Sequence, residues 1–130
     1  MILVDTSAWI ELLRSTSHPA HLALRRCLEE RRPIATAEPI IMELLAGTRS
    51  RREYNRLRSR LLAFPLLRLR GLPDFERAAA LYLTCRSKGG TVRKLMDCLI
   101  AALAIREQAT VLHNDKDFET LARYAGLRIE

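Results

Sequence analysis

Two acidic residues stand alone within apolar segments of the sequence. Glu43 is the only charge in the run PIIMELLA, and Asp97 is the only charge in LMDCLIAA. A carboxylate among apolar side chains is costly to ionise unless a cation compensates its charge. The two segments therefore predict one of two arrangements. Either each acid forms a buried ion pair, Asp97 with Arg93 or Lys94 and Glu43 with an arginine of the next helix, or the acids bind a cation.

Two further acids follow short apolar strands. Asp5 comes directly after Ile2–Val4, and Asp115 follows Thr110–Leu112 after two polar residues. In an open parallel sheet, ligands bind beyond the carboxyl ends of the strands, so both acids should reach one edge. The alternative is that each acid caps a helix, a position where aspartate is favoured.

Four carboxylates at one place repel one another and raise one another's pKa, a conflict that a divalent cation removes. All-oxygen ligands suit Mg²⁺ or Mn²⁺. Such an ion can generate hydroxide from water and stabilise charge on a phosphodiester. The sequence therefore predicts metal-dependent phosphodiester hydrolysis by an acidic cluster of Asp5, Glu43, Asp97 and Asp115.

The charge balance favours an anionic partner. The chain has 22 Lys and Arg against 15 Asp and Glu, a net charge of +7. Nucleic acid is the common partner of such a basic protein, and arginines concentrate between Arg49 and Arg60. This segment could contact RNA or a second copy of the chain, or it could be a solvated face, as charge runs usually are.

Other chemistries lack their motifs. There is no glycine-rich phosphate loop, no HExxH pair, and Ser7 lies in no GxSxG turn. His18 and His21 are expected at the surface, whereas His113 adjoins Asp115 and could contact substrate. Three cysteines without CxxC spacing are expected in the core: Cys27, Cys85 and Cys98.

Neither a membrane span nor a secretion signal is expected. The longest apolar run, Cys98–Ile105, is far shorter than the roughly 20 residues that cross a bilayer. The start of the chain has no basic segment and reaches Asp5 at once, unlike a signal peptide. We therefore expect a cytoplasmic protein.

Short strands alternating with helices predict one domain, residues 1–130, folded as a three-layer α/β/α sandwich around a short parallel sheet. The expected strands are Ile2–Val4, Ile34–Ala37, Leu66–Leu69, Thr110–Leu112 and Leu127–Ile129. The expected helices are Thr6–Leu13, Ala20–Glu30, Ile40–Ala46, Arg51–Leu62, Asp74–Arg86, Lys94–Gln108 and Lys116–Ala125.

Four segments in a fixed order, ILVDTSAWI, ELLAG, DCLIAALA and NDKDF, carry a family resemblance. The chain resembles the PIN-domain ribonucleases, and among them the VapC-type toxins of toxin–antitoxin pairs. The resemblance covers essentially the whole chain. It implies an α/β/α fold and an endoribonuclease that uses Mg²⁺ or Mn²⁺ and cuts RNA, transfer RNA among its targets.

The resemblance also implies roles for single residues. Asp5 and Asp97 would bind the metal directly, while Glu43 and Asp115 would complete the cluster. Asp117, in the same motif as Asp115, would either bind the metal, orient its neighbours or cap a helix. The candidates for substrate contact are Thr6, Ser7, Arg93, His113 and Asn114. Many members carry threonine or serine in place of His113, so this chain lacks a hydroxyl there.

The expected partners come from the same resemblance. These toxins form homodimers and are inhibited by a VapB-type antitoxin, whose tail often brings a basic residue into the acidic groove. A non-catalytic RNA-binding module is the main alternative, but it gains nothing from acids inside apolar helices. A phosphatase with Asp5 as nucleophile would carry a second acid where Ser7 stands.

Overall fold

A four-stranded parallel sheet lies at the centre of the computed structural model, which describes residues 1–130. Its strands run in the order β3-β2-β1-β4, and Ile2 pairs with both Ile34 and Thr110. The strands are β1 (Ile2–Val4), β2 (Ile34–Ala37), β3 (Leu66–Leu67) and β4 (Thr110–Leu112). The fifth predicted strand is reduced to a single bridge between Val111 and Ile129.

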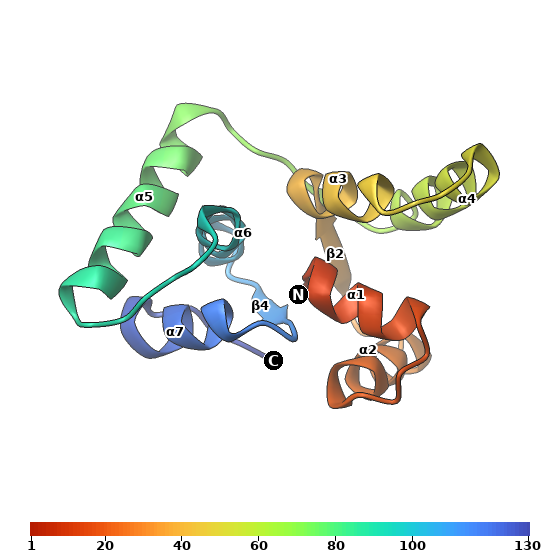
Figure 1. Cartoon of the computed structure of the whole chain (residues 1–130), viewed down its shortest axis with the longest axis horizontal. Coiled ribbons are helices and arrows are strands. Elements are labelled where there is room, and N and C mark those ends of the chain that lie inside the picture. The colour runs from red at the N-terminus through yellow and green to blue at the C-terminus, as the bar shows by residue number, and fades with distance from the viewer.

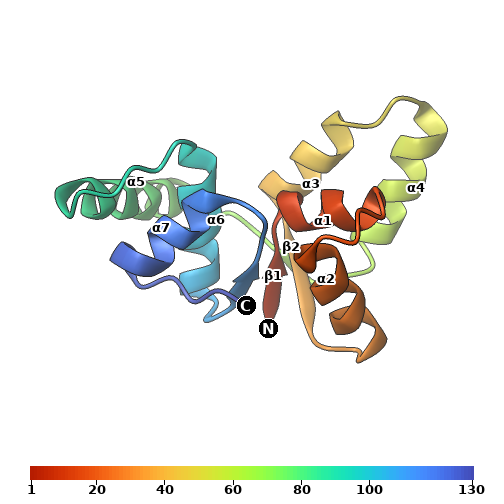
Figure 2. The ribbon, with the colours of Figure 1, turned by 60° about the horizontal axis from the view of Figure 1, so that its bottom comes forward.

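Seven helices cover the two faces of this sheet. They are α1 (Thr6–Leu13), α2 (Pro19–Glu29), α3 (Glu38–Ala46), α4 (Arg51–Leu61), α5 (Leu72–Ser87), α6 (Leu95–Arg106) and α7 (Lys116–Ala125). Figure 2 shows α5, α6 and α7 on one side of the strands and the other four helices on the opposite side. The predicted three-layer α/β/α sandwich is confirmed. None of the helices combines the length and the apolar character needed to cross a lipid bilayer.

Helix α6 is the most deeply buried element. Every residue from Asp97 to Ala104 is buried, because α6 lies among α5, α7 and β4 (Figure 1). Such enclosure explains why its sequence is apolar on all sides rather than along one stripe. The three cysteines are free and buried, as predicted. A charge on α6 therefore needs a partner supplied by another element.

One such partnership ties the C-terminal end of α6 to the start of α5. The Arg106 guanidinium donates to Asp74, and these side chains are only 10% and 2% exposed. Asp74 also accepts a bond from the backbone N–H of Arg70 at 2.7 Å, and Arg106 donates to the carbonyl of Arg68 at 2.8 Å. Burial alone would raise the pKa of Asp74, but these donors lower it below its ordinary value.

The prediction that His18 and His21 both lie at the surface is wrong for His21, which is 7% exposed. Its Nδ1 accepts a bond at 2.9 Å from the N–H of Ser17, in the turn between α1 and α2. His18 is half-buried and caps α2, accepting from the N–H of Ala20 at 3.1 Å. Backbone donors in a tight turn thus draw both rings inward.

Gly90, between α5 and α6, packs against α7 without room for a side chain. A Cβ there would lie 2.7 Å from the Tyr124 ring and 3.0 Å from Cγ2 of Thr120. We expect Gly90→Ala to lower the free energy of unfolding by about 1–3 kcal/mol through overpacking. Chemical denaturation measures the loss. Gly47→Ala is the matched control, because its Cβ would meet nothing closer than 3.5 Å. Equal effects of the two substitutions would contradict the packing argument.

Candidate active site and metal centre

Asp5 and Asp115 both cap helices and both lie at the carboxyl edge of the sheet. Asp5 Oδ2 accepts from the N–H of Ser7 at 3.0 Å, and Asp115 Oδ1 accepts from the N–H of Asp117 at 2.9 Å. Each cap uses one oxygen of the carboxylate. The two interpretations of these acids are therefore compatible, because one oxygen can cap the helix while the other faces a cation.

Asp97 is the most constrained carboxylate of the cluster. It is 5% exposed, and its Oδ2 is buried without a hydrogen-bond partner. Burial, followed by the charges of Asp115 and Asp5, raises the pKa of Asp97 to about 8. A buried oxygen that lacks a donor and sits among other acids suits a bound cation.

The prediction that apolar side chains enclose Glu43 is wrong, because the Glu43 side chain is exposed. Helix α3 buries Pro39, Ile40 and Leu44 but turns its other face to solvent, where Met42 is 56% exposed. Partial burial and then the charge of Asp5 raise the pKa of Glu43. Glu43 thus stands at the exposed rim of the cluster, close enough to interact with Asp5.

Asp117 holds the chain that enters α6. Its side chain is 3% exposed, and its two oxygens accept from the N–H groups of Arg93 at 3.0 Å and Lys94 at 2.9 Å. One oxygen each of Asp97, Asp115 and Asp117 lie within 4.8 Å of one another. Asp117 therefore lies beside the cluster, but its oxygens are already engaged with backbone, which favours a positioning role.

Lys94 brings a positive charge into the cluster. Its ammonium contacts Asp115 Oδ2 and lies 3.7 Å from Asp97 Oδ2. The hydrogen bond to Asp115 raises the pKa of Lys94 to about 12. Burial alone would raise the pKa of Asp115, but this ammonium and the N–H of Asp117 lower it. The ion pair foreseen for Asp97 thus exists, although Lys94 is shared with Asp115 and makes its shorter contact there.

The candidates for substrate contact also build the loops around the acids. Ser7 Oγ donates to Asp5 Oδ2 at 2.5 Å and accepts from the N–H of Asn114 at 2.9 Å, joining the loops after β1 and β4. The Asn114 side chain donates to Glu11 Oε1 at 3.1 Å. These bonds fix Asp5 relative to Asp115, so Ser7 and Asn114 have a positioning role that spacing alone did not reveal.

The remaining candidates differ in exposure. His113 Nδ1 accepts from the N–H of Asp115 at 3.1 Å, its ring packs 5.2 Å from that of Phe118, and burial lowers its pKa. The Thr6 hydroxyl is buried without a partner, whereas Arg93 is exposed. A pocket of about 470 Å³, lined in part by His18, His113 and Asn114, opens beside Asp115. Of these three groups, only His113 lines this pocket.

The donor set fits a hard divalent cation. Asp97, Asp115 and Asp117 bring one carboxylate oxygen each within 4.8 Å of one another, whereas Asp5 and Glu43 lie outside this group and interact with it through charge. Mg²⁺ and Mn²⁺ prefer such oxygen ligands, and a cation would supply the partner that Asp97 Oδ2 lacks. This arrangement can hold an ion next to water at the carboxyl edge of the sheet.

The family model of the PIN domain matches residues 2–124. Ribonuclease VapC11 of Mycobacterium tuberculosis is 44% identical over 129 residues, which cover 98% of this chain and 96% of that one. A solved toxin–antitoxin complex from Klebsiella pneumoniae superposes with a TM-score of 0.68 and 26% identity, over 91% of this chain and 90% of that one. The chain therefore belongs to the PIN-domain family and, within it, to the VapC ribonucleases.

Proposed function

We propose that this protein is an endoribonuclease that requires Mg²⁺ or Mn²⁺ and serves as the toxin of a toxin–antitoxin pair. The observation that carries the proposal is the buried Oδ2 of Asp97 within a cluster of acids, which accepts no hydrogen bond and has only the Lys94 ammonium nearby, at 3.7 Å. The names of relatives support the RNA substrate, since VapC11 is called a ribonuclease and VapC20 of the same organism a toxin that cleaves the sarcin–ricin loop.

In this proposal each acid has a distinct task. Asp5 and Asp97 would hold the metal, and Glu43 and Asp115 would complete the cluster. A divalent ion bound there would supply an activated water and stabilise negative charge on the phosphodiester. Asp117 fixes the backbone that enters α6, so that Asp97 keeps its position.

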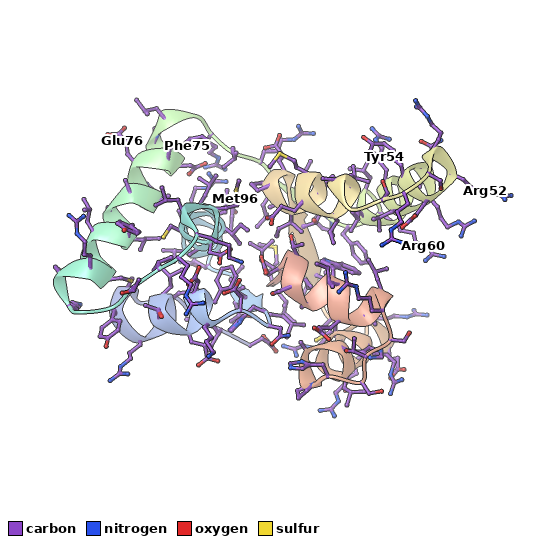
Figure 3. The ribbon with its side chains drawn as sticks, in the orientation of Figure 1. Arg52, Tyr54, Arg60, Phe75, Glu76 and Met96 are labelled. Carbon is purple, nitrogen blue, oxygen red and sulfur yellow. The ribbon has the colours of Figure 1, made fainter.

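The arginines on α4 and just before it support an RNA partner. All of them are exposed and none forms an ion pair. They are Arg49, which precedes the helix, and Arg51, Arg52, Arg56, Arg58 and Arg60 within it. Figure 3 places Arg52, Tyr54 and Arg60 together at one end of the molecule, with Phe75 toward the other end. A groove of about 420 Å³ is lined by Arg14, Arg49 and Glu43, so it extends from this basic region to the acid at the rim of the cluster. An RNA backbone could therefore reach the acids along positive charge.

Two kinds of protein partner belong to the proposal. The similar Klebsiella structure is a toxin–antitoxin complex, and a VapB-type antitoxin that brings a cation into the cluster would satisfy the same carboxylates as the metal. A homodimer remains a prediction of the family resemblance. The large apolar side chains exposed on α5 and α6, Leu72, Phe75 and Leu95, would be covered by a second copy. The proposal places the protein in the cytoplasm, where its RNA substrate occurs.

Removal of the metal is the direct test. We expect RNA cleavage with Mg²⁺ or Mn²⁺ to fall at least about 100-fold with excess chelator and to return when metal is restored, because metal-activated water supplies the nucleophile. Gel analysis of end-labelled RNAs, transfer RNA included, measures the rate. RNA binding without cleavage across a broad panel would favour the non-catalytic module. Hydrolysis of phosphomonoesters alone would favour the phosphatase.

A further inference from the structure

One basic side chain, that of Lys94, contacts the acid cluster. Its ammonium contacts Asp115 Oδ2 and stands 3.7 Å from Asp97 Oδ2. The two neighbouring cations behave differently, because Arg93 and Lys116 are both exposed and neither forms an ion pair. Lys94 therefore supplies positive charge to the two carboxylates that face each other across α6 and α7.

The backbone of Lys94 is fixed, but its side chain is free to move. Its N–H donates to Asp117 Oδ2 at 2.9 Å, and the residue is the N-cap of α6 in an extended conformation. The side chain is 59% exposed, and its only hydrogen bond is to Asp115. A flexible four-carbon stem on a fixed Cα lets the ammonium leave Asp115 without any change in the fold.

A bound metal ion would repel the Lys94 ammonium, and the mobile side chain allows the ammonium to move away. A divalent cation at Asp97 and Asp115 repels an ammonium only a few ångströms away, because like charges at that range interact strongly near a protein surface. A phosphodiester that then approaches the metal brings a negative charge beside the displaced ammonium. Lys94 can reach that charge from its fixed Cα.

We propose that Lys94 is a further catalytic residue, a tethered cation that pairs with Asp97 and Asp115 in the metal-free enzyme and binds the scissile phosphate of RNA after the metal has bound. This inference rests on the proposed function. It assigns Lys94 two opposing effects: it weakens metal binding, and it stabilises the negative charge that develops on the phosphate during cleavage.

Lys94→Met separates these effects because it keeps the length of the stem and removes the charge. Calorimetric titration of the RNA-free protein with Mn²⁺ should show binding about 10-fold tighter, since the competing ammonium is gone. At saturating Mn²⁺, kcat for RNA cleavage should fall about 100-fold, as when one group that stabilises the transition state is lost. Lys94→Arg should recover part of kcat.

Lys116→Met is the matched control, because it removes a neighbouring exposed lysine that has no ion pair. It should leave Mn²⁺ affinity and kcat nearly unchanged. If Lys94→Met weakened Mn²⁺ binding and lowered the Tm together with kcat, Lys94 would be structural and the proposal wrong. Tighter Mn²⁺ binding with unchanged kcat would overturn the phosphate contact. If wild-type protein cut no RNA, the proposed function and the phosphate contact would fall together, and the Mn²⁺ titration would still decide the competition.

Discussion

Asp97→Asn is expected to lower the rate of RNA cleavage at least about 1000-fold at saturating Mg²⁺ or Mn²⁺. Asp97 Oδ2 is buried and has no donor in the protein, so the metal would be its partner. An amide keeps the shape but brings no negative charge and turns N–H donors toward the ion. Single-turnover cleavage of labelled RNA measures the loss. Glu76→Gln, an exposed acid on α5, is the control and should cut normally. Retention of more than about a tenth of the rate would show that Asp97 is not a metal ligand.

The same substitution should stabilise the metal-free protein. The pKa of Asp97 is about 8 in the fold, above its value in the unfolded chain, so ionisation opposes folding. This penalty is absent near pH 4, grows as the pH rises, and levels off above pH 8. After allowance for solvent screening, Asp97→Asn should raise the Tm by about 3–6 °C at pH 8 in chelator and by little at pH 4. A larger rise in Tm at pH 4 than at pH 8 would contradict the expectation that ionised Asp97 opposes folding.

Arg106→Met should lower the free energy of unfolding by about 3–5 kcal/mol, or roughly 10–15 °C in Tm. The substitution leaves Asp74, 2% exposed, without the guanidinium that balances its charge. Urea denaturation measures the change. Arg70→Met is the control, because Arg70 is 69% exposed and its 3.6 Å pair with Glu107 should contribute less than about 1 kcal/mol.

The double substitution of Arg106→Met with Asp74→Asn tests whether the uncompensated charge of Asp74 causes the loss of stability. A neutral amide needs no cation, so the double variant should be more stable than Arg106→Met alone. The amide oxygen can still accept from the N–H of Arg70. If the second substitution destabilised the protein further, packing of the Arg106 stem rather than charge would explain the loss.

Asp5 and Asp115 show what a local pattern can predict. Each follows a short apolar strand, and parallel strands end at one edge, so sequence order alone predicts that both acids share that edge. The bounds of the helices were predicted within two residues for the same reason, since apolar spacing and the positions of proline and glycine are local signals. Glu43 shows the limit of this reasoning, because apolar neighbours in sequence did not bury it.

The sequence by itself determined the order of strands and helices, the edge where the acids gather, and the family to which their segments belong. Only the tertiary structure decided which atoms those acids meet. Asp117 engages the backbone of Lys94, 23 residues away, and Arg106 reaches Asp74 across 32 residues. The position of the Lys94 ammonium between Asp97 and Asp115 also depends on the tertiary structure. The physical reason is that solvent exposure and hydrogen-bond partners depend on contacts between distant segments, whereas strand and helix periodicity depends on neighbours in the chain.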